Sequence, residues 1–298
     1  RKGPVSTNNS IHARYDIDEM PPWGEATLLG IQHVLVMMAS NVTLPIVLAT
    51  AIGATTGETA FLVQVALLVA GLTTFLQTVG FGPVGSRLPI VQGTSFGFLA
   101  VSIPLAQDYG IAAVFGGAIF AGVVQVALGF SLRWLQVLFP PLVSGIVVLV
   151  IGIGLATFAT PIARLVLVIM LVLYRFGNGL IGASAVLISL VIGYLVAIPM
   201  GKVDFAEINE AKWFAIPTPL EFGLDFPVAA LIAMGAMAIA TSVETIGDLS
   251  AVTKSGAGRE VTKKEMSGGV IADGVSTAFA SLFSALPNTT FGQNVGLV

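Results

Sequence analysis

The chain has 298 residues, of which 55% are hydrophobic and 10% are charged, and its mean hydropathy is +0.94. Soluble globular domains carry about 25% charged residues, so this composition excludes that class and predicts an all-α polytopic membrane protein. The net charge of −3 is too small to indicate a nucleic-acid partner, and the absence of cysteine from the sequence excludes disulfides, thiol catalysis and cysteine-ligated metals.

Apolar windows of about 20 residues, the length of helix that crosses a bilayer, recur along the chain. Residues 1–22 are polar and have no apolar signal-peptide core, so they are expected to form a cytoplasmic tail. Spans are predicted over residues 26–51, 59–84, 88–107, 111–132, 138–159, 165–178, 180–200, 226–252 and 267–286, and a tenth begins near Thr289. The short join at 160–165 indicates a missing loop, and the tenth span is expected to continue beyond Val298.

The distribution of basic residues sets the expected orientation. If the N-terminus is inside, only Arg164, Lys202 and Lys212 of the 13 Lys and Arg residues fall on the outer side. This asymmetry follows the positive-inside rule and predicts a multi-pass protein of the cell inner (plasma) membrane with a cytoplasmic N-terminus. The polar, acidic stretch 202–225 is interpreted as a solvated outer loop.

Two spans begin with sequences that interrupt a helix. Residues 88–96 read Leu-Pro-Ile-Val-Gln-Gly-Thr-Ser-Phe, which predicts a β-like stretch that turns helical from about Ser95. Residues 286–293, Leu-Pro-Asn-Thr-Thr-Phe-Gly-Gln, open the tenth span in a similar way. Interrupted segments in corresponding positions of two halves indicate a transporter binding site. The first break would offer free backbone N–H groups to an electronegative ligand atom, and Phe96 could stack on a planar ring.

Carboxylates at membrane depth are costly, so their default interpretation is functional. Glu244 and Asp248 are four residues apart and share one helical face, where an ionised carboxylate would accept adjacent N–H donors such as those of a nucleobase edge. Such a group is also suited to couple proton and substrate. For Asp248, a cap or a salt bridge, with Lys254 nearby, is an equal alternative. Asp273 is either a proton relay or a structural partner of the first break.

Amide and imidazole side chains also lie within the apolar spans, next to the interrupted segments or in the first span. His33 is interpreted first as a hydrogen-bonded core residue, and Gln32 would either reach a substrate or pack against a broken segment. Asn41 is expected to bond across helices. Gln293 carries both a donor and an acceptor, so it could read the mixed edge of a purine or pyrimidine. Asn294 is expected to tie down the broken backbone.

The chain resembles the nucleobase–ascorbate transporter family through an ordered set of motifs. These are Gln-His at 32–33, Gly-Thr-Ser-Phe at 93–96, Glu-Thr-x-Gly-Asp at 244–248, Ala-Asp-Gly at 272–274 and Gln-Asn-x-Gly at 293–296. The resemblance implies an inverted-repeat transporter with 7+7 spans in the full protein and a homodimer. It assigns 23–136 and 226–298 to a core domain, 137–201 to a gate domain, and leaves 202–225 as the outer loop.

The resemblance also implies roles for single residues. Glu244 matches the principal substrate-binding carboxylate, Gln293 the second contact, and Ser95 with Phe96 the contact from the third span. Proton coupling or support of the site falls to the remaining motif residues: His33, Asp248, Asp273, Gln32, Asn294 and Thr94. Gln293 together with Asp248 resembles the xanthine and uric acid branch, and the small Ser95 would leave room for the extra oxygen of uric acid.

These inferences predict a proton-coupled symporter of oxidised purines, xanthine and/or uric acid, in which the core slides against the gate. A uracil or broad-specificity nucleobase symporter is the alternative. Glu244 argues against an anion transporter, and a channel would need a continuous polar stripe instead of islands. The sequence shows no nucleophile–base set and no metal-ligand spacing, so no enzyme activity, metal or cofactor is expected. The expected partners are a nucleobase, protons, the lipid bilayer and a second copy of the chain.

Overall fold

The computed structural model describes residues 19–135, 146, 161–177, 185–203 and 217–295. The predicted span 138–159, most of the tail and most of the outer loop lie outside these residues. Their helices are α1 (Trp23–Ile52), α2 (Thr56–Val79), α3 (Phe96–Tyr109), α4 (Ile111–Leu135), α6 (Pro161–Phe176), α8 (Ala185–Ala197), α9 (Val228–Gly256), α10 (Lys263–Leu282) and α11 (Gly292–Val295). Two short strands, β1 (Gln92–Thr94) and β2 (Asn288–Thr290), complete the fold.

Four described helices are long and apolar enough to cross a membrane: α1, α2, α4 over Ile111–Leu132, and α9. Large apolar side chains on these helices point outward, with Trp23 80% exposed, Val228 70% and Ile232 68%. A surface of this kind is stable against lipid and costly in water. The protein is therefore a helical membrane protein, as the composition predicts.

The end of the second span differs from the prediction. The span was expected to reach residue 84, but α2 ends at Val79 and Gly80 follows with φ 69°. Gly82 and Gly85 also have positive φ, a conformation that glycine adopts without steric cost. The turn that they form brings the Gly85 N–H to the carbonyl oxygen of Gly268 in α10 at 2.9 Å. Apolar composition alone did not show that these glycines end the helix.

The two predicted breaks are real and meet each other. Ser95 has extended backbone (φ −81°, ψ 125°) and caps α3, so the helix begins where the sequence predicted. β1 and β2 pair antiparallel, with Gln92 opposite Thr290 and Thr94 opposite Asn288. Backbone groups outside a helix need partners at membrane depth, and each strand supplies them to the other. The sequence predicted two interruptions but not their pairing.

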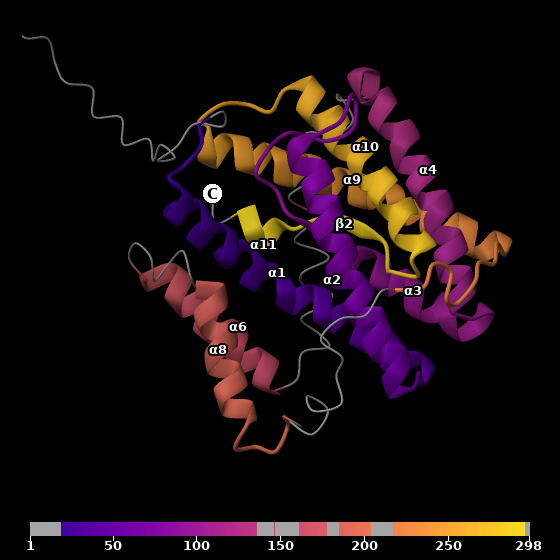
Figure 1. The fold of residues 1–298 in the computed structure, drawn as a ribbon, viewed down its shortest axis with the longest axis horizontal. Helices are drawn as coiled ribbons and strands as arrows, with labels where there is room; N and C mark the ends of the chain where they lie inside the picture. Colours follow the sequence, from indigo (N-terminus) through magenta and orange to yellow (C-terminus); the bar gives the residue numbers. More distant parts are fainter. Residues whose placement is uncertain (1–18, 136–145, 147–160, 178–184, 204–216, 296–298) are drawn as a thin grey trace, which may run out of the picture.

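Small residues let the core helices approach closely. A Cβ added at Gly122 of α4 would lie 2.5 Å from the carbonyl oxygen of Gly274 in α10, and the reverse distance is also 2.5 Å. α4 also packs against α9, while α1 and α2 contact β1, and α9 and α10 contact β2. Figure 1 shows α6 and α8 packed together on the other side of α1 from α9 and α10.

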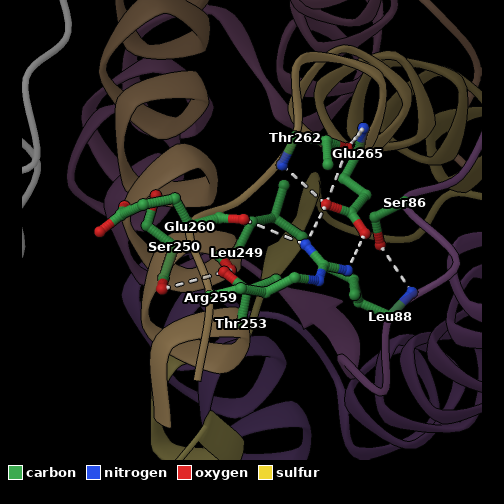
Figure 2. A network of polar contacts seen from close by, with 9 residues as sticks. All are labelled: Ser86, Leu88, Leu249, Ser250, Thr253, Arg259, Glu260, Thr262 and Glu265. Carbon is green, nitrogen blue, oxygen red and sulfur yellow. Dashed lines mark hydrogen bonds and ion pairs between the residues drawn. The ribbon is translucent and has the colours of Figure 1, made fainter. Parts of the chain in front are cut away.

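The turn between α9 and α10 is held by an arginine–glutamate clamp (Figure 2). Arg259 donates from Nη1 and Nη2 to the two carboxylate oxygens of Glu265, at 3.0 and 2.6 Å. Glu265 also closes the capping box of α10 with Thr262, whose backbone N–H donates to it at 2.7 Å. Partial burial would raise the pKa of Glu265, but the bonds from Arg259 and Thr262 outweigh this and hold that pKa below its usual range.

This lowered pKa predicts a pH-dependent contribution to stability. The Glu265 clamp should stabilise the fold above the unfolded-state pKa of about 4.3 and lose its effect as pH falls through the lower folded-state pKa. Glu265→Gln should cost about 1 kcal/mol at neutral pH, because the clamp is partly exposed. Thermal unfolding of both purified proteins at several pH values measures the difference in stability between the wild type and Glu265→Gln. This difference should disappear in acid. Glu260→Gln is the control, since its pair with Lys254 is 74%/73% exposed; an equal loss in both variants would contradict the prediction.

Candidate functional site

The candidate site surrounds the crossing of β1 and β2, and α9 supplies its carboxylates. Asp248 is buried and its Oδ2 accepts a hydrogen bond from Thr290 of β2 at 2.7 Å. A Cβ added at Gly292 would lie 3.0 Å from Asp248 Oδ1, so the second break passes directly over this carboxylate. The alternative of a salt bridge from Lys254 is wrong, because Lys254 pairs with Glu260 at 3.2 Å.

Asp273 fastens the first break to the helices behind it. It is fully buried, and its two carboxylate oxygens accept hydrogen bonds from Gln92 Nε2 and from the hydroxyl of Thr245. Ser276 donates to the other end of the same amide, Gln92 Oε1, at 2.8 Å. A buried carboxylate is tolerated only with such partners. Asp273 is thus a structural partner of the first break, one of the two roles predicted for it, and the proton relay stays a prediction.

Two asparagines hold the strands from the sides. Asn41 of α1 accepts the Thr94 N–H at 2.7 Å, which confirms its predicted bond across helices. A Cβ added at Gly93 would lie 2.5 Å from Asn41 Oδ1, so only glycine allows this approach. Asn288 of β2 donates to the hydroxyl of Thr73 in α2 at 3.0 Å. Each broken segment is thus anchored to a complete helix.

The short helix α11 is attached to α1. Asn294 Nδ2 donates to the carbonyl oxygen of His33 at 2.9 Å and lies 3.1 Å from Nδ1 of the same residue. Asn294 therefore ties down backbone, as predicted, although the backbone belongs to α1 instead of the break. His33 is hydrogen-bonded, in line with its interpretation as a core residue. Gln293 donates to Ser40 Oγ at 2.9 Å and is half-buried, close to the same helix.

The first break offers fewer free backbone donors than predicted. The N–H groups of Gln92 and Ser95 already donate, to Thr74 Oγ1 at 2.9 Å and to the Pro287 carbonyl at 2.8 Å. The Ser95 hydroxyl accepts from the backbone of the first turn of α3. Within the described residues, Phe96 and Gly97 keep backbone N–H groups without a hydrogen-bond partner, because the first groups of a helix have none inside it.

The Phe96 side chain is half-buried and packs against the apolar cluster that contains Leu44 and Phe98. This contact is the ordinary packing role of a phenylalanine in an apolar span. A stacking contact with a planar ligand therefore remains a prediction.

Several buried oxygens of the candidate site are unused as acceptors. Glu244 Oε2, Thr94 Oγ1 and Asn294 Oδ1 have no hydrogen-bond partner within the described residues, and neither has Gln125 Oε1 of α4. Buried polar atoms are nearly always hydrogen-bonded, so each such atom needs an explanation. Glu244 lies on the face of α9 that carries Asp248, and Thr94 closes β1. The start of α3 faces the same part of α9, because a Cβ added at Gly97 would lie 3.2 Å from Thr241, one turn before Glu244.

Sequence reasoning missed several residues that build this site. Gln92 belongs to the predicted break at residues 88–96, but its side chain was given no role. Thr245, Thr290 and Ser276 were not identified as site residues. Hydroxyl side chains are common in membrane helices, and most bond to their own helix backbone. A signal did exist, because Thr245 follows Glu244 directly and Gln92 opens the break.

A family model described as the Permease family matches residues 24–164 and 158–298. The chain belongs to this family of permeases. The two matched segments overlap at 158–164, at the join where the sequence indicates a missing loop. The match takes in every motif residue of the candidate site.

Within this family, the chain is similar to bacterial xanthine and uric acid permeases. The uric acid transporter UacT of Escherichia coli (strain K12) is 32% identical over 305 residues, which cover 95% of this chain and 63% of that protein. The xanthine permease of Bacillus subtilis (strain 168) is 33% identical over 295 residues, covering 93% and 67%. The uric acid permease PucJ of the same organism is 35% identical over 294 residues, covering 91% and 65%. These matches confirm the resemblance to bacterial xanthine and uric acid permeases, of whose length the chain spans about two thirds.

A solved structure shares the fold. The transmembrane domain of the cyanobacterial bicarbonate transporter BicA has a TM-score of 0.54 and 18% identity, covering 89% of this chain and 76% of that domain. At this identity the likeness concerns the fold alone. The permease therefore has the helical fold of a membrane transporter domain.

Proposed function

We propose that the permease is a proton-coupled symporter of oxidised purines, xanthine and/or uric acid. The observation that carries the proposal is the buried Glu244 Oε2, which has no hydrogen-bond partner within the described residues and lies on α9 one turn before Asp248. A carboxylate accepts two N–H donors side by side, and a xanthine-like ring offers such donors along one edge. The names of the relatives, which are xanthine and uric acid permeases, support the same class of substrate.

The neighbouring groups would complete recognition of the ring. The free N–H groups of Phe96 and Gly97 would donate to a ring carbonyl oxygen at the positive end of α3. Gln293 would read a mixed donor and acceptor edge, and the Phe96 ring would stack on the purine. Ser95, whose hydroxyl and amide serve the backbone, would shape the pocket by its small volume.

The arrangement of helices supports a moving core. α1 to α4 and α9 to α11 pack with one another around the strand pair, whereas within the described residues α6 and α8 pack with each other and α8 touches α1. In the proposed cycle the core slides against a gate that includes α6 and α8, as in an elevator. The inverted 7+7 repeat, the homodimer and the cytoplasmic N-terminus in the inner membrane belong to this proposal.

Uptake of radiolabelled xanthine by the full-length protein tests the proposal. Cells without their own purine permeases would be assayed with unlabelled uric acid, hypoxanthine and uracil as competitors, and with a protonophore. Uptake blocked by uric acid and by the protonophore supports a proton-coupled carrier of oxidised purines. Uracil uptake without xanthine uptake would favour the uracil alternative, and uptake that ignores the protonophore would contradict proton coupling.

Gln293 provides a test of substrate choice. In Gln293→Glu the amide donor is lost and a second negative charge faces the ring, so xanthine affinity should fall by about tenfold, which corresponds to about 1.4 kcal/mol. Competition by a panel of purines and uracil measures the change. Ser40→Ala is the control, since it removes only the partner of Gln293 at 2.9 Å. Equal affinities across the panel in Gln293→Glu would exclude Gln293 from the site.

A further inference from the structure

Two threonine hydroxyls join the carboxyl groups of Asp248 and Asp273. Thr245 of α9 donates to Asp273 Oδ2, and Thr290 of β2 donates to Asp248 Oδ2 at 2.7 Å. The two hydroxyl oxygens, Thr290 Oγ1 and Thr245 Oγ1, lie 3.5 Å apart. The carboxyl and hydroxyl oxygens therefore form a row from Asp248 to Asp273 in which each oxygen lies within 3.5 Å of the next.

The hydroxyl group of Thr290 can change its hydrogen-bond acceptor. Thr290 has two acceptors within reach, Asp248 Oδ2 at 2.7 Å and Thr245 Oγ1 at 3.5 Å, but a single hydroxyl proton. It bonds one acceptor at a time, and rotation of its hydroxyl changes the acceptor. Thr245 uses its own hydroxyl hydrogen in the bond to Asp273, so the Thr245 oxygen can accept a hydrogen bond from another group. Thr289, whose hydroxyl oxygen is 3.3 Å from that of Thr245, is a second hydroxyl beside this oxygen and also hydrogen-bonds to Asp273.

Burial leaves few other routes to Asp273. Exposure falls along the row from Asp248 at 6% through Thr290 at 1% to Thr245 and Asp273 at 0%. A proton from outside can reach Asp273 only through a neighbouring group. Its other described partners are the Gln92 amide, which donates an N–H and does not readily release that proton, and the hydroxyl of Thr289. Of the two hydroxyls, that of Thr245 lies within 3.5 Å of the Thr290 hydroxyl bonded to Asp248, so it is the neighbour placed to pass on a proton from Asp248.

Few other ionisable groups face this row. Glu244 lies one turn from Asp248 on α9, and His33 of α1 touches α11 through Asn294. The strands β1 and β2 and the helix α11 contain no ionisable side chain. The other charged side chains of these helices lie at or near helix ends. They are Lys254 of α9, Lys263, Lys264 and Glu265 of α10, Glu58 of α2 and Asp108 of α3.

We infer that Thr290 and Thr245 relay a proton between Asp248 and Asp273, an inference that rests on the proposed proton coupling. Protonated Asp248 gives its proton to Thr290 Oγ1, and the original Thr290 proton passes to Thr245 Oγ1. The original Thr245 proton passes to Asp273 Oδ2. Each threonine ends with one proton, Asp248 loses one and Asp273 gains one. The movement reverses the hydrogen bonds that connect both breaks to α9 and α10, which links the protonation state to the geometry of the substrate site.

The test separates proton coupling from substrate movement. The full-length protein would be reconstituted in liposomes, and radiolabelled xanthine would be followed in two assays: accumulation driven by a proton gradient, and exchange against internal xanthine at equal pH. Thr245→Val keeps the shape of the side chain and removes the hydroxyl. It should reduce gradient-driven accumulation by about 100-fold while exchange persists. Thr245→Ser, which restores the hydroxyl, should restore accumulation.

Thr253→Val is the matched control. Thr253 is buried on the same helix, and its hydroxyl bonds only to the helix carbonyls of Leu249 and Ser250. Full accumulation by Thr245→Val would overturn the relay. Loss of both assays in Thr245→Val, or equal losses in the Val and Ser variants, would assign Thr245 a packing role and also overturn it. Wild-type protein that neither accumulates nor exchanges any purine would instead contradict the proposed function.

Infrared spectroscopy decides the relay without any transport. The carbonyl stretch of protonated carboxyl groups would be recorded across pH in the purified protein, and Asp248→Asn would identify the Asp248 band. The described hydrogen bond to Asp248 comes from Thr290, whereas Thr245 donates to Asp273. A shift of the Asp248 band in Thr245→Val would therefore show that the hydroxyls connect the two carboxyl groups. An unchanged Asp248 band would overturn the relay, whatever the transport assays gave.

Discussion

Glu244→Gln is expected to abolish xanthine uptake while the protein still inserts in the membrane. The substitution keeps the size of the side chain but removes its charge and replaces one acceptor oxygen by a donor amide. Since Glu244 Oε2 has no hydrogen-bond partner within the described residues, little of the fold depends on it. The loss falls on the ligand, for which a charge-assisted bond is worth about 2–3 kcal/mol, or roughly 100-fold in affinity.

Two measurements make this prediction sharp. Xanthine uptake in cells gives the transport rate, and thermal unfolding of the purified variant should match the wild type within a few degrees. Glu260→Gln removes a carboxylate whose side chain is 73% exposed, so its uptake should be unchanged. Proton-coupled uptake at the full rate in Glu244→Gln would refute the role assigned to Glu244.

Asp273→Leu is expected to have the largest effect on stability. Leucine nearly fills the volume, but Gln92 Nε2 and the Thr245 hydroxyl lose their acceptor inside a fully buried site. Each unsatisfied donor costs about 1–3 kcal/mol, so the fold should lose about 3–5 kcal/mol. The yield of folded protein and its unfolding midpoint in detergent measure this loss.

Ser276→Ala is the comparison for Asp273→Leu. It leaves only Gln92 Oε1 without its donor at 2.8 Å, so the expected cost is about 1 kcal/mol. A stable Asp273→Leu protein would mean that the first break is held chiefly by strand pairing and by Asn41. In that case the polar cluster behind the break would serve another purpose than fixing Gln92.

Local sequence predicted much of the site because some features depend on adjacent residues. The helix start at Phe96 follows from the proline and glycine that precede it and from Ser95 as a cap. The shared face of Glu244 and Asp248 follows from their spacing of four. The second span shows the limit, since apolar composition continued to residue 84 while Gly80 and its neighbours had already turned the chain.

Hydrogen-bond partners could not be predicted in the same way. Asp273 was assigned two equal roles because its partner Gln92 is 181 residues away in the sequence. The first break was expected to offer free backbone N–H groups, but the Ser95 N–H donates to the carbonyl oxygen of Pro287 on the other break. Both outcomes depend on β1 and β2 meeting, which neither short strand encodes alone.

The sequence by itself determined the class, the two interruptions and the order of the polar islands, because hydrophobicity, proline, glycine and helical spacing act over a few residues. Only the tertiary structure decided which polar groups are paired and which are not. It paired Asp248 with Thr290 and Asp273 with Gln92 and Thr245, and within the described residues it gave Glu244 Oε2 no partner. The physical reason is that hydrogen bonds are short and directional, so the packing of distant segments selects the partners.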